Sequence, residues 1–137
     1  MNIPIIDRSN YLKGLFIAAK LDGQLNSHKK EILKEISDRL GFSRDFYEET
    51  VRNLLRNKYI KEEKIKFSSK EIAISFLNDA INISTSEGNL KEKEINWLKE
   101  IAQLNDVETE LLKKDLETIK NILFENNRGN IALLSII

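Results

Sequence analysis

Two short stretches of the chain repeat the same pattern of residues at an offset of 65 positions. Residues 21–29 read LDGQLNSHK and residues 86–94 read SEGNLKEKE, so each copy places an acid, a glycine, an amide and a leucine in succession. The match continues in a Leu-Lys-Glu-Ile run that begins at Leu33 in one copy and at Leu98 in the other. A repeat of this length is typical of a duplicated helical hairpin rather than of a short solenoid repeat.

Each copy of the pattern predicts a tight turn between two helices. Gly23 is expected to end the first helix, because a glycine adopts a left-handed conformation without a clash at Cβ. Leu25 is then expected to turn inward between the helices, and Asn26 or Ser27 to cap the second one. In the second copy, Glu94 falls in the first helical turn, where the helix dipole favours negative charge.

Composition limits the classes of protein to which the chain can belong. Its 137 residues are 41% hydrophobic and 32% charged, which suits a single domain with a substantial core. The formal net charge is +0, so we expect no electrostatic attraction to nucleic acid or to an anionic membrane. The absence of cysteine excludes disulfides, thiolate metal sites and a cysteine nucleophile. The first residues do not resemble a signal peptide, and we expect a cytoplasmic protein without membrane insertion.

Helical spacing of apolar residues recurs along the chain, and no segment alternates strictly between apolar and polar residues. We expect extended residues 1–8, with Ile3, Ile5 and Ile6 covering the core, and a first helix that begins near Ser9. Two further helices are expected at about 27–40, where Gly41 is the stop, and at about 91–104. Three others are expected to begin at a cap at Ser43, at a capping box at 68–71 and at Asp106, and the last of these runs to Leu123.

These patterns together predict an all-α, single-domain helical bundle of about six to seven helices, built from two pseudo-repeated helix-turn-helix halves. The halves span about 10–57 and 68–125, and residues 57–67 form a charged connector between them that has room for a short helix. Residues 126–137 form an apolar tail that we expect to pack on the domain or on a partner.

A calcium-binding EF-hand is the first candidate for the repeated turns, and the spacing excludes it. With Gly23 at the sixth position of such a loop, Ala18 and Lys20 occupy positions that need oxygen ligands. With Gly88 at the sixth position, Ile83 occupies the first ligand position. Too few ligands remain for a standard loop.

The turns do resemble those of the TerB-like family, helical domains associated with tellurite resistance and stress responses. Its hallmark is similar to a helix that ends in Ala-x-x-Asp-Gly, followed about six residues later by Glu and an amphipathic helix, in two halves. Residues 18–23 (AAKLDG) match the first half, and Glu87-Gly88 with Glu94 and Leu98 matches the second. The resemblance covers roughly residues 10–125.

The resemblance implies a surface on which acids near the two turns bind a divalent cation such as Ca²⁺, Mg²⁺ or Mn²⁺. Carried over residue by residue, it nominates Asp22, Glu87 and Glu94 as metal ligands. The chain departs from the family pattern at Lys29, which stands at the first-half position that matches Glu94, and at Glu87, where the family usually has aspartate. A lysine at this position is able to neutralise the acids through an ion pair.

No other motif in the sequence points to chemistry. The chain has no nucleophile elbow and no phosphate-binding glycine loop, so we expect a protein that is not an enzyme, with no catalytic residues. His28 is expected to face solvent. Trp97, Tyr47 and Tyr59 are candidates for partly exposed anchors of a protein partner, with core or edge packing as the default.

Three hypotheses of function follow from the sequence. The first is a non-enzymatic TerB-like binding or scaffold module in a stress-associated complex, with a protein partner and a weak divalent-cation site. The second is a metal-free interaction adaptor or immunity-type protein. The third is an enzyme that uses the acid pair, and it receives the least support, because no catalytic motif accompanies the acids.

Overall fold

A computed structural model describes residues 3–21, 25–56, 63–84, 91–107 and 131–137 of the chain. Within these residues all regular structure is helical, which confirms the all-α prediction. The elements are α1 (Ile5–Leu21), α2 (Ser27–Arg39), α3 (Arg44–Arg56), α4 (Lys70–Ser84), α5 (Glu92–Leu104) and a 3-10 helix, η1 (Ala132–Ser135). A helix was expected from Asp106 to Leu123, and its residues after Val107 lie outside the described part of the chain. Residues 57–62 of the connector also lie outside it.

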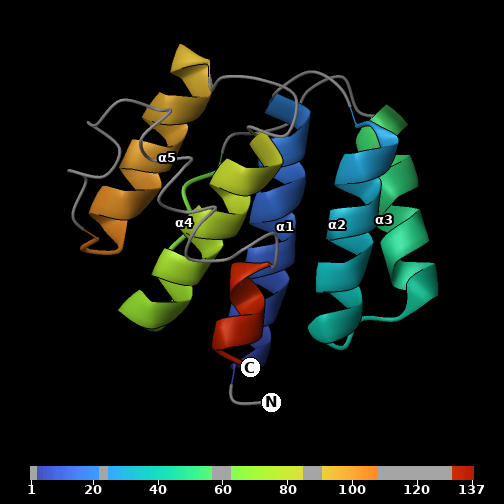
Figure 1. The fold of residues 1–137 in the computed structure, drawn as a ribbon, viewed down its shortest axis with the longest axis horizontal. Coiled ribbons are helices and arrows are strands. Elements are labelled where there is room, and N and C mark those ends of the chain that lie inside the picture. Colours follow the sequence, from blue (N-terminus) through green and yellow to red (C-terminus); the bar gives the residue numbers. More distant parts are fainter. Residues whose placement is uncertain (1–2, 22–24, 57–62, 85–90, 108–130) are drawn as a thin grey trace.

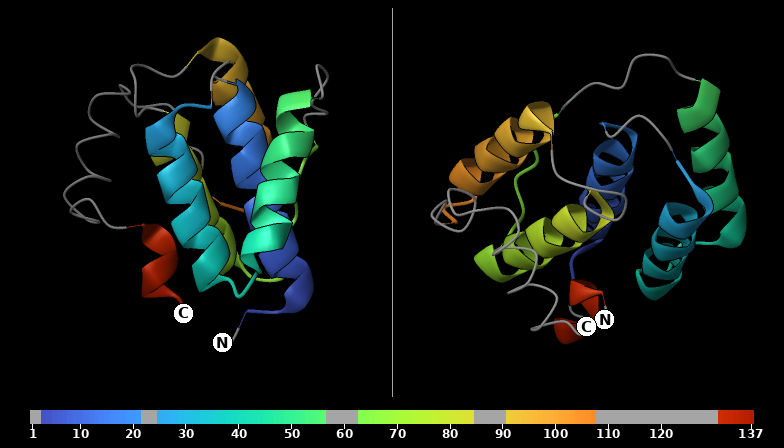
Figure 2. Two further views of the ribbon diagram at one scale, coloured as in Figure 1. Left: turned by 90° about the vertical axis from the view of Figure 1, so that its right-hand side faces the viewer. Right: turned by 45° about the horizontal axis from the view of Figure 1, so that its top comes forward.

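Helix α1 runs through the middle of the molecule (Figure 1). It packs mainly on α4 on one side and on α2 on the other, while α3 lies outside α2 and α5 lies outside α4 (Figures 1 and 2). Residues 14–19 of α1 are all buried, so the burial extends around the whole circumference of the helix. A helix that is apolar on every side is stable only when other elements surround it.

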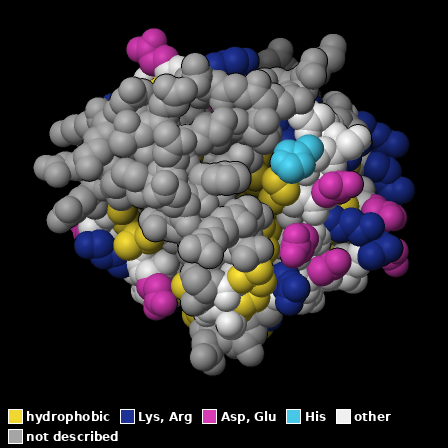
Figure 3. All heavy atoms as spheres, in the orientation of Figure 1, with side chains coloured by type: hydrophobic (Ala, Val, Ile, Leu, Met, Phe, Trp, Pro, Cys, Tyr) yellow, Lys and Arg dark blue, Asp and Glu magenta, His cyan; other side chains and the backbone are white. Residues whose placement is uncertain are grey.

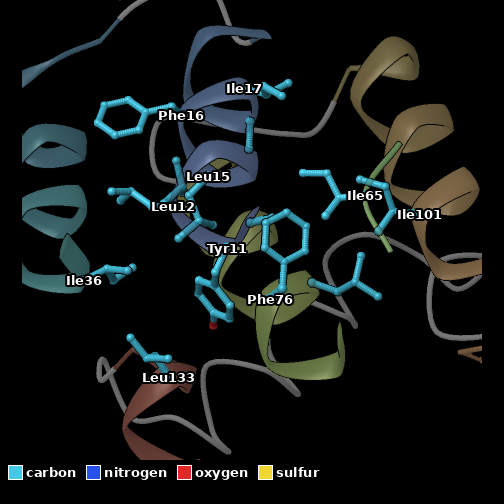
Figure 4. Packing of buried hydrophobic residues seen from close by; sticks show 14 of the residues in the cluster. Tyr11, Leu12, Leu15, Phe16, Ile17, Ile36, Ile65, Phe76, Ile101 and Leu133 are labelled. Atoms are coloured by element: carbon cyan, nitrogen blue, oxygen red, sulfur yellow. The ribbon is translucent and has the colours of Figure 1, made fainter. Parts of the chain in front are cut away.

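Helix α1 packs tightly against α4 at Gly14. A Cβ atom at Gly14 would lie 2.5 Å from Phe76 Cε1 and 2.8 Å from Ile65 Cδ1. The Phe76 ring also meets the Tyr11 ring edge-on, with ring centroids 5.6 Å apart and an interplanar angle of 85°. Figure 4 shows Tyr11 and Phe76 side by side in the core between the helices. The missing side chain of Gly14 therefore makes room for a large aromatic ring.

The sequence predicted several helix ends correctly. Asn26 Oδ1 accepts a hydrogen bond from the Lys29 amide at 2.8 Å and caps α2. Gly41 follows α2 with φ of +89°, a conformation that glycine adopts at little cost. Ser43 Oγ accepts from the Phe46 amide at 3.1 Å and caps α3. Helix α5 begins at Glu92, with Lys91 as its N-cap, close to the expected start.

The expectation of an extended N-terminal segment up to residue 8 is wrong. Helix α1 begins at Ile5, and the Arg8 amide donates to the Pro4 carbonyl at 3.0 Å to close the first turn. Proline suits the start of a helix because its fixed φ is already helical. Ile3 is buried as expected, but Ile5 and Ile6 are 72% and 67% exposed, since the early helix start turns both away from the core.

The cap of α4 is also displaced from its expected residue. Ser69 Oγ accepts from the Ile72 amide at 3.2 Å, so the cap is Ser69 rather than Ser68. Ser68 is engaged by Asp7 of α1 instead: Asp7 Oδ1 accepts from the Ser68 amide at 3.0 Å, and Asp7 Oδ2 accepts from the Ser68 hydroxyl. A buried carboxylate on α1 therefore fixes the start of α4.

The connector contributes to the core through residues 63–67, which have no regular secondary structure. Ile65 and Phe67 are buried, and the Asn105 side chain binds the backbone of both. It accepts from the Phe67 amide at 2.7 Å and donates to the Ile65 carbonyl at 2.8 Å. Trp97 is 2% exposed and donates from Nε1 to the Glu63 carbonyl at 3.0 Å, so it is a core residue rather than an exposed anchor.

Tyr47 is likewise a core residue. The Tyr47 hydroxyl donates to the Lys30 carbonyl at 2.8 Å, which ties α3 to α2. Tyr59 lies outside the described residues. The core-packing default is therefore correct for Tyr47 and Trp97.

Replacement of Gly14 by alanine tests the close approach of α1 to α4. Alanine normally stabilises a helix interior relative to glycine by about 1 kcal/mol. Here we expect Gly14→Ala to lower the free energy of unfolding by about 1–3 kcal/mol, because the added methyl group displaces buried Phe76. Urea denaturation measures the change, with Ser9→Ala at an exposed position of α1 as the control. A stabilised Gly14→Ala protein would contradict this packing.

Candidate functional site

The described helix ends that flank the two predicted turns lie at one end of the molecule. In Figure 1 the last turn of α1, the first turn of α2, the last turn of α4 and the first turn of α5 all point to the upper end. Asp22 and Glu87 lie outside the described residues. Glu94, the third nominated ligand, lies in the first turn of α5 and is only 1% exposed.

Lys29 occupies the corresponding place in α2 and is fully buried. Its Nζ donates to the carbonyl of Ala19 at 3.4 Å, close to the C-terminal end of α1. A cation at this end of a helix is favoured by the helix dipole. A buried ammonium on α2 and a buried carboxylate on α5 therefore stand at positions 65 residues apart.

The described residues do not test the three-residue metal site. Across residues 3–21, 25–56, 63–84, 91–107 and 131–137, no three His, Cys, Asp or Glu side chains come together to hold a metal ion. Because Asp22 and Glu87 fall in the gaps between these ranges, their grouping with Glu94 stays a prediction. His28 is exposed, as expected.

Asp79 of α4 is one of the best-connected polar groups in the described core, and no motif in the sequence pointed to it. Asp79 is 1% exposed. Its Oδ1 accepts from the Ala132 amide at 2.6 Å, and its Oδ2 accepts from the Leu133 amide at 3.1 Å and from the Tyr11 hydroxyl at 2.5 Å. Tyr11 is also 2.9 Å from Ser75 Oγ. Asp79 therefore joins α1, α4 and η1 through a single carboxylate.

Burial is the largest influence on the acidity of this cluster. It raises the pKa of Asp79 to about 6, although the hydrogen bonds from Tyr11, Ala132 and Leu133 act in the opposite direction. Burial also raises the pKa of Tyr11 well above its ordinary value, and the neighbouring charge of Asp79 adds to that shift. Tyr11 therefore stays protonated and acts as a donor to Asp79.

The sequence contained a signal for this cluster. Ser75 and Asp79 are four residues apart, so they share a face of α4 with the apolar residues of its buried stripe. A carboxylate on an apolar stripe needs hydrogen-bond donors from elsewhere in the fold. Of the donors to Asp79, Tyr11 lies 68 positions earlier in the chain, and Ala132 and Leu133 lie 53 and 54 positions later. Local sequence patterns do not reveal partners at these separations.

A hollow of about 380 Å³ opens beside the cluster, between α4 and the C-terminal segment. Its lining includes the side chains of Ile74, Ser75 and Asn78, together with Ala132 and Ile136. Ser75 is therefore the member of the cluster nearest to this opening, while the Asp79 carboxylate is covered by the backbone of Ala132 and Leu133.

The described surface mixes charges of both signs. Figure 3 shows basic and acidic side chains interspersed over the side of the molecule where α2 and α3 lie. In the described part of the chain, no helix combines the length and the apolar character needed to cross a membrane.

Comparisons with known proteins provide no family assignment: no family model matches the chain, and no curated protein or solved structure matches it significantly. The TerB-like resemblance therefore stays a prediction from the residues of the turns.

Truncation of Asp79 tests its structural role. We expect Asp79→Ala to lower the free energy of unfolding at pH 7.5 by at least about 2 kcal/mol, because three buried donors lose their acceptor. Urea denaturation measures the change. Asp38→Ala removes the same atoms from an exposed position of α2 and should alter stability by less than about 0.5 kcal/mol. Equal effects of the two substitutions would refute the role of Asp79.

Proposed function

We propose that the chain is a non-enzymatic, TerB-like binding or scaffold module associated with stress or tellurite resistance. Its functional end is the one formed by the two helical turns, where Asp22, Glu87 and Glu94 provide a weak divalent-cation site for Ca²⁺, Mg²⁺ or Mn²⁺. The observation that carries the proposal is that α2 and α5 bury equivalent residues at an offset of 65 positions, which is the offset of the repeated turn sequences.

The equivalence is supported by the bounds and the burial of the two helices. Helix α5 begins and ends 65 residues after α2, the same offset as the sequence repeat. Leu33 and Ile36 of α2 and their counterparts Leu98 and Ile101 of α5 are all 0% exposed. Two hairpins that bury the same positions are the result expected from an internal duplication of a helix-turn-helix unit.

The position of Glu94 supports a site at the turns. Glu94 is 1% exposed and lies in the first turn of α5, six residues after Gly88. Divalent cations of this kind bind oxygen ligands from several chain segments. A site between the turns would bring Glu94 together with acids that directly precede Gly23 and Gly88 in the sequence.

A metal-free interaction adaptor or immunity-type protein is the second candidate, and Lys29 favours it. An ammonium buried at the position equivalent to Glu94 supplies the positive charge that an ion would bring. Exposed apolar side chains also suit a protein partner. Phe46 is 47% exposed and stacks on Phe42, with ring centroids 5.0 Å apart.

Partners of other kinds have less support. The net charge of +0 and the mixed surface argue against nucleic acid, so we propose another protein as the partner. We also propose that the module works in the cytoplasm and that it catalyses no reaction. The Asp79 cluster, the best-connected acidic group described, is occupied by backbone amides rather than open to a substrate.

Thermal unfolding in the presence of EDTA, Ca²⁺, Mg²⁺ or Mn²⁺ tests the cation site. An ion that binds only the folded protein raises the melting temperature with the logarithm of its concentration. We expect millimolar ion to raise the melting temperature of the wild type, and we expect no rise in the Asp22→Asn/Glu87→Gln/Glu94→Gln variant.

A matched control separates the turns from general screening of acidic charge. The Asp45→Asn/Glu48→Gln/Glu49→Gln variant removes the same charge from exposed positions of α3 and should keep the ion-dependent rise. A wild type that shows no rise contradicts the cation site and favours the metal-free adaptor. In that event, a rise that appears in Lys29→Gln would identify Lys29 as the group that replaces the ion.

A further inference from the structure

The large apolar side chains that the described part of the chain leaves exposed all lie at one end of the molecule. Helices α1, α3 and α4 begin at this end, α2 and α5 end there, and the label C lies beside it in Figures 1 and 2. It is opposite the helix ends that flank the two predicted turns. The exposed side chains, which together are here called the apolar end, are Ile5, Ile6, Phe46, Ile74, Leu104 and Ile137.

Contacts between the elements bring these side chains to the same end. The Arg8 guanidinium lies beside the turn between α2 and α3, because a Cβ atom at Gly41 would be 3.8 Å from Arg8 Nη1. The start of α1 is also tied to the start of α4 by the buried carboxylate described above. The hollow beside α4 is lined by Ile74 and Ile136, so the last residues of the chain lie against the first turns of α4.

The apolar end has the composition of a protein interface. Ile5 and Ile6 are 72% and 67% exposed in the first turn of α1. Phe46 is the aromatic member, and its ring stacks on half-buried Phe42 with an interplanar angle of 21°. Large exposed apolar side chains that gather in one region mark an interaction site, and aromatic residues are enriched in the centre of such sites.

The charges around the apolar end are evenly mixed, and this mixture decides which kind of partner suits it. Three of the helix ends here each carry an exposed acid directly next to an exposed base. The pairs are Asp38-Arg39 at the end of α2, Arg44-Asp45 at the start of α3 and Lys70-Glu71 at the start of α4. Nucleic acid and anionic lipid bind surfaces that are predominantly basic, which these balanced pairs do not provide.

A second copy of the chain does suit a surface of this kind. In a two-fold contact the same surface meets itself, so each contact of one residue with another occurs twice. A rim with equal numbers of acids and bases can then oppose acid with base in both directions, whereas a rim of one sign would repel itself. The formal net charge of the chain is +0, so no overall repulsion opposes the approach of two copies.

We propose that the apolar end is a homodimer interface, on which the same end of a second copy packs in a two-fold contact around Ile5, Ile6 and Phe46. The contact removes these side chains from water and leaves the helix ends that flank the turns at the outer ends of the dimer. It does not depend on the cation site.

Sedimentation-velocity ultracentrifugation of the full chain between about 1 µM and about 1 mM tests the interface, because this range covers weak and moderate affinities. We expect the mass of the wild type to rise from one chain to two. The Ile5→Ser/Ile6→Ser/Phe46→Ser variant should have a dissociation constant at least about tenfold higher. The His28→Ser/Glu31→Ser variant, which changes exposed side chains near the opposite end of α2, is the control and should dimerise like the wild type.

A pair of charge variants tests the self-complementary rim without a change to the apolar side chains. Arg39→Glu/Arg44→Glu/Lys70→Glu makes the three pairs acidic, and Asp38→Lys/Asp45→Lys/Glu71→Lys makes them basic. We expect each variant alone to dimerise at least about tenfold more weakly, because like charges then face each other. An equimolar mixture of the two should recover the mass of two chains.

A wild type that keeps the mass of one chain over the whole range would overturn the proposal. A monomer that instead sediments with vesicles of phosphatidylcholine and phosphatidylglycerol would overturn it in favour of a lipid surface. Dimers that persist unchanged in the serine variant and in both charge variants would also overturn it, since the contact would then lie elsewhere. If the serine variant does not fold, the two charge variants and their mixture decide the question.

Discussion

The approach of α1 to α4 at Gly14 is the constraint on which the rest of the structure depends. Gly14 admits the ring of Phe76, and that ring in turn meets Tyr11 of α1 and Phe67 of the connector, with centroids 5.6 and 5.1 Å away. The two helices form the centre of the molecule, and α2 and α5 pack on its opposite sides. Gly14 thus allows close packing on the α4 side of α1, and α2 covers the other side.

Two buried aspartates extend this centre to the rest of the chain. Asp7 of α1 binds the amide and hydroxyl of Ser68 before α4, and Asp79 of α4 binds the amides at the start of η1. Each carboxylate costs free energy to bury and recovers it by satisfying donors that would otherwise lack a partner.

Local chemistry in the sequence was sufficient to predict the helical class and several helix ends. Asn26, Gly41 and Ser43 act within three or four residues of their own positions, so short patterns reveal them. The sequence did not reveal Asp79, because its partners are 53 and 68 residues away along the chain. Ser69 replaced Ser68 as the cap of α4 for a similar reason, since the distant Asp7 engages Ser68. The cation site at Asp22, Glu87 and Glu94 stays a prediction, since two of the three acids lie outside the described residues.

The central claim is that Asp79 brings α1, α4 and η1 together in one buried cluster. Nuclear Overhauser spectroscopy of the labelled protein tests this claim most directly. Because the Tyr11 hydroxyl and the Leu133 amide bind the same oxygen of Asp79, the account predicts cross-peaks from the Tyr11 ring to both the Phe76 ring and the Leu133 amide. A Tyr11 ring with cross-peaks to Phe76 and none to the Leu133 amide would contradict the account.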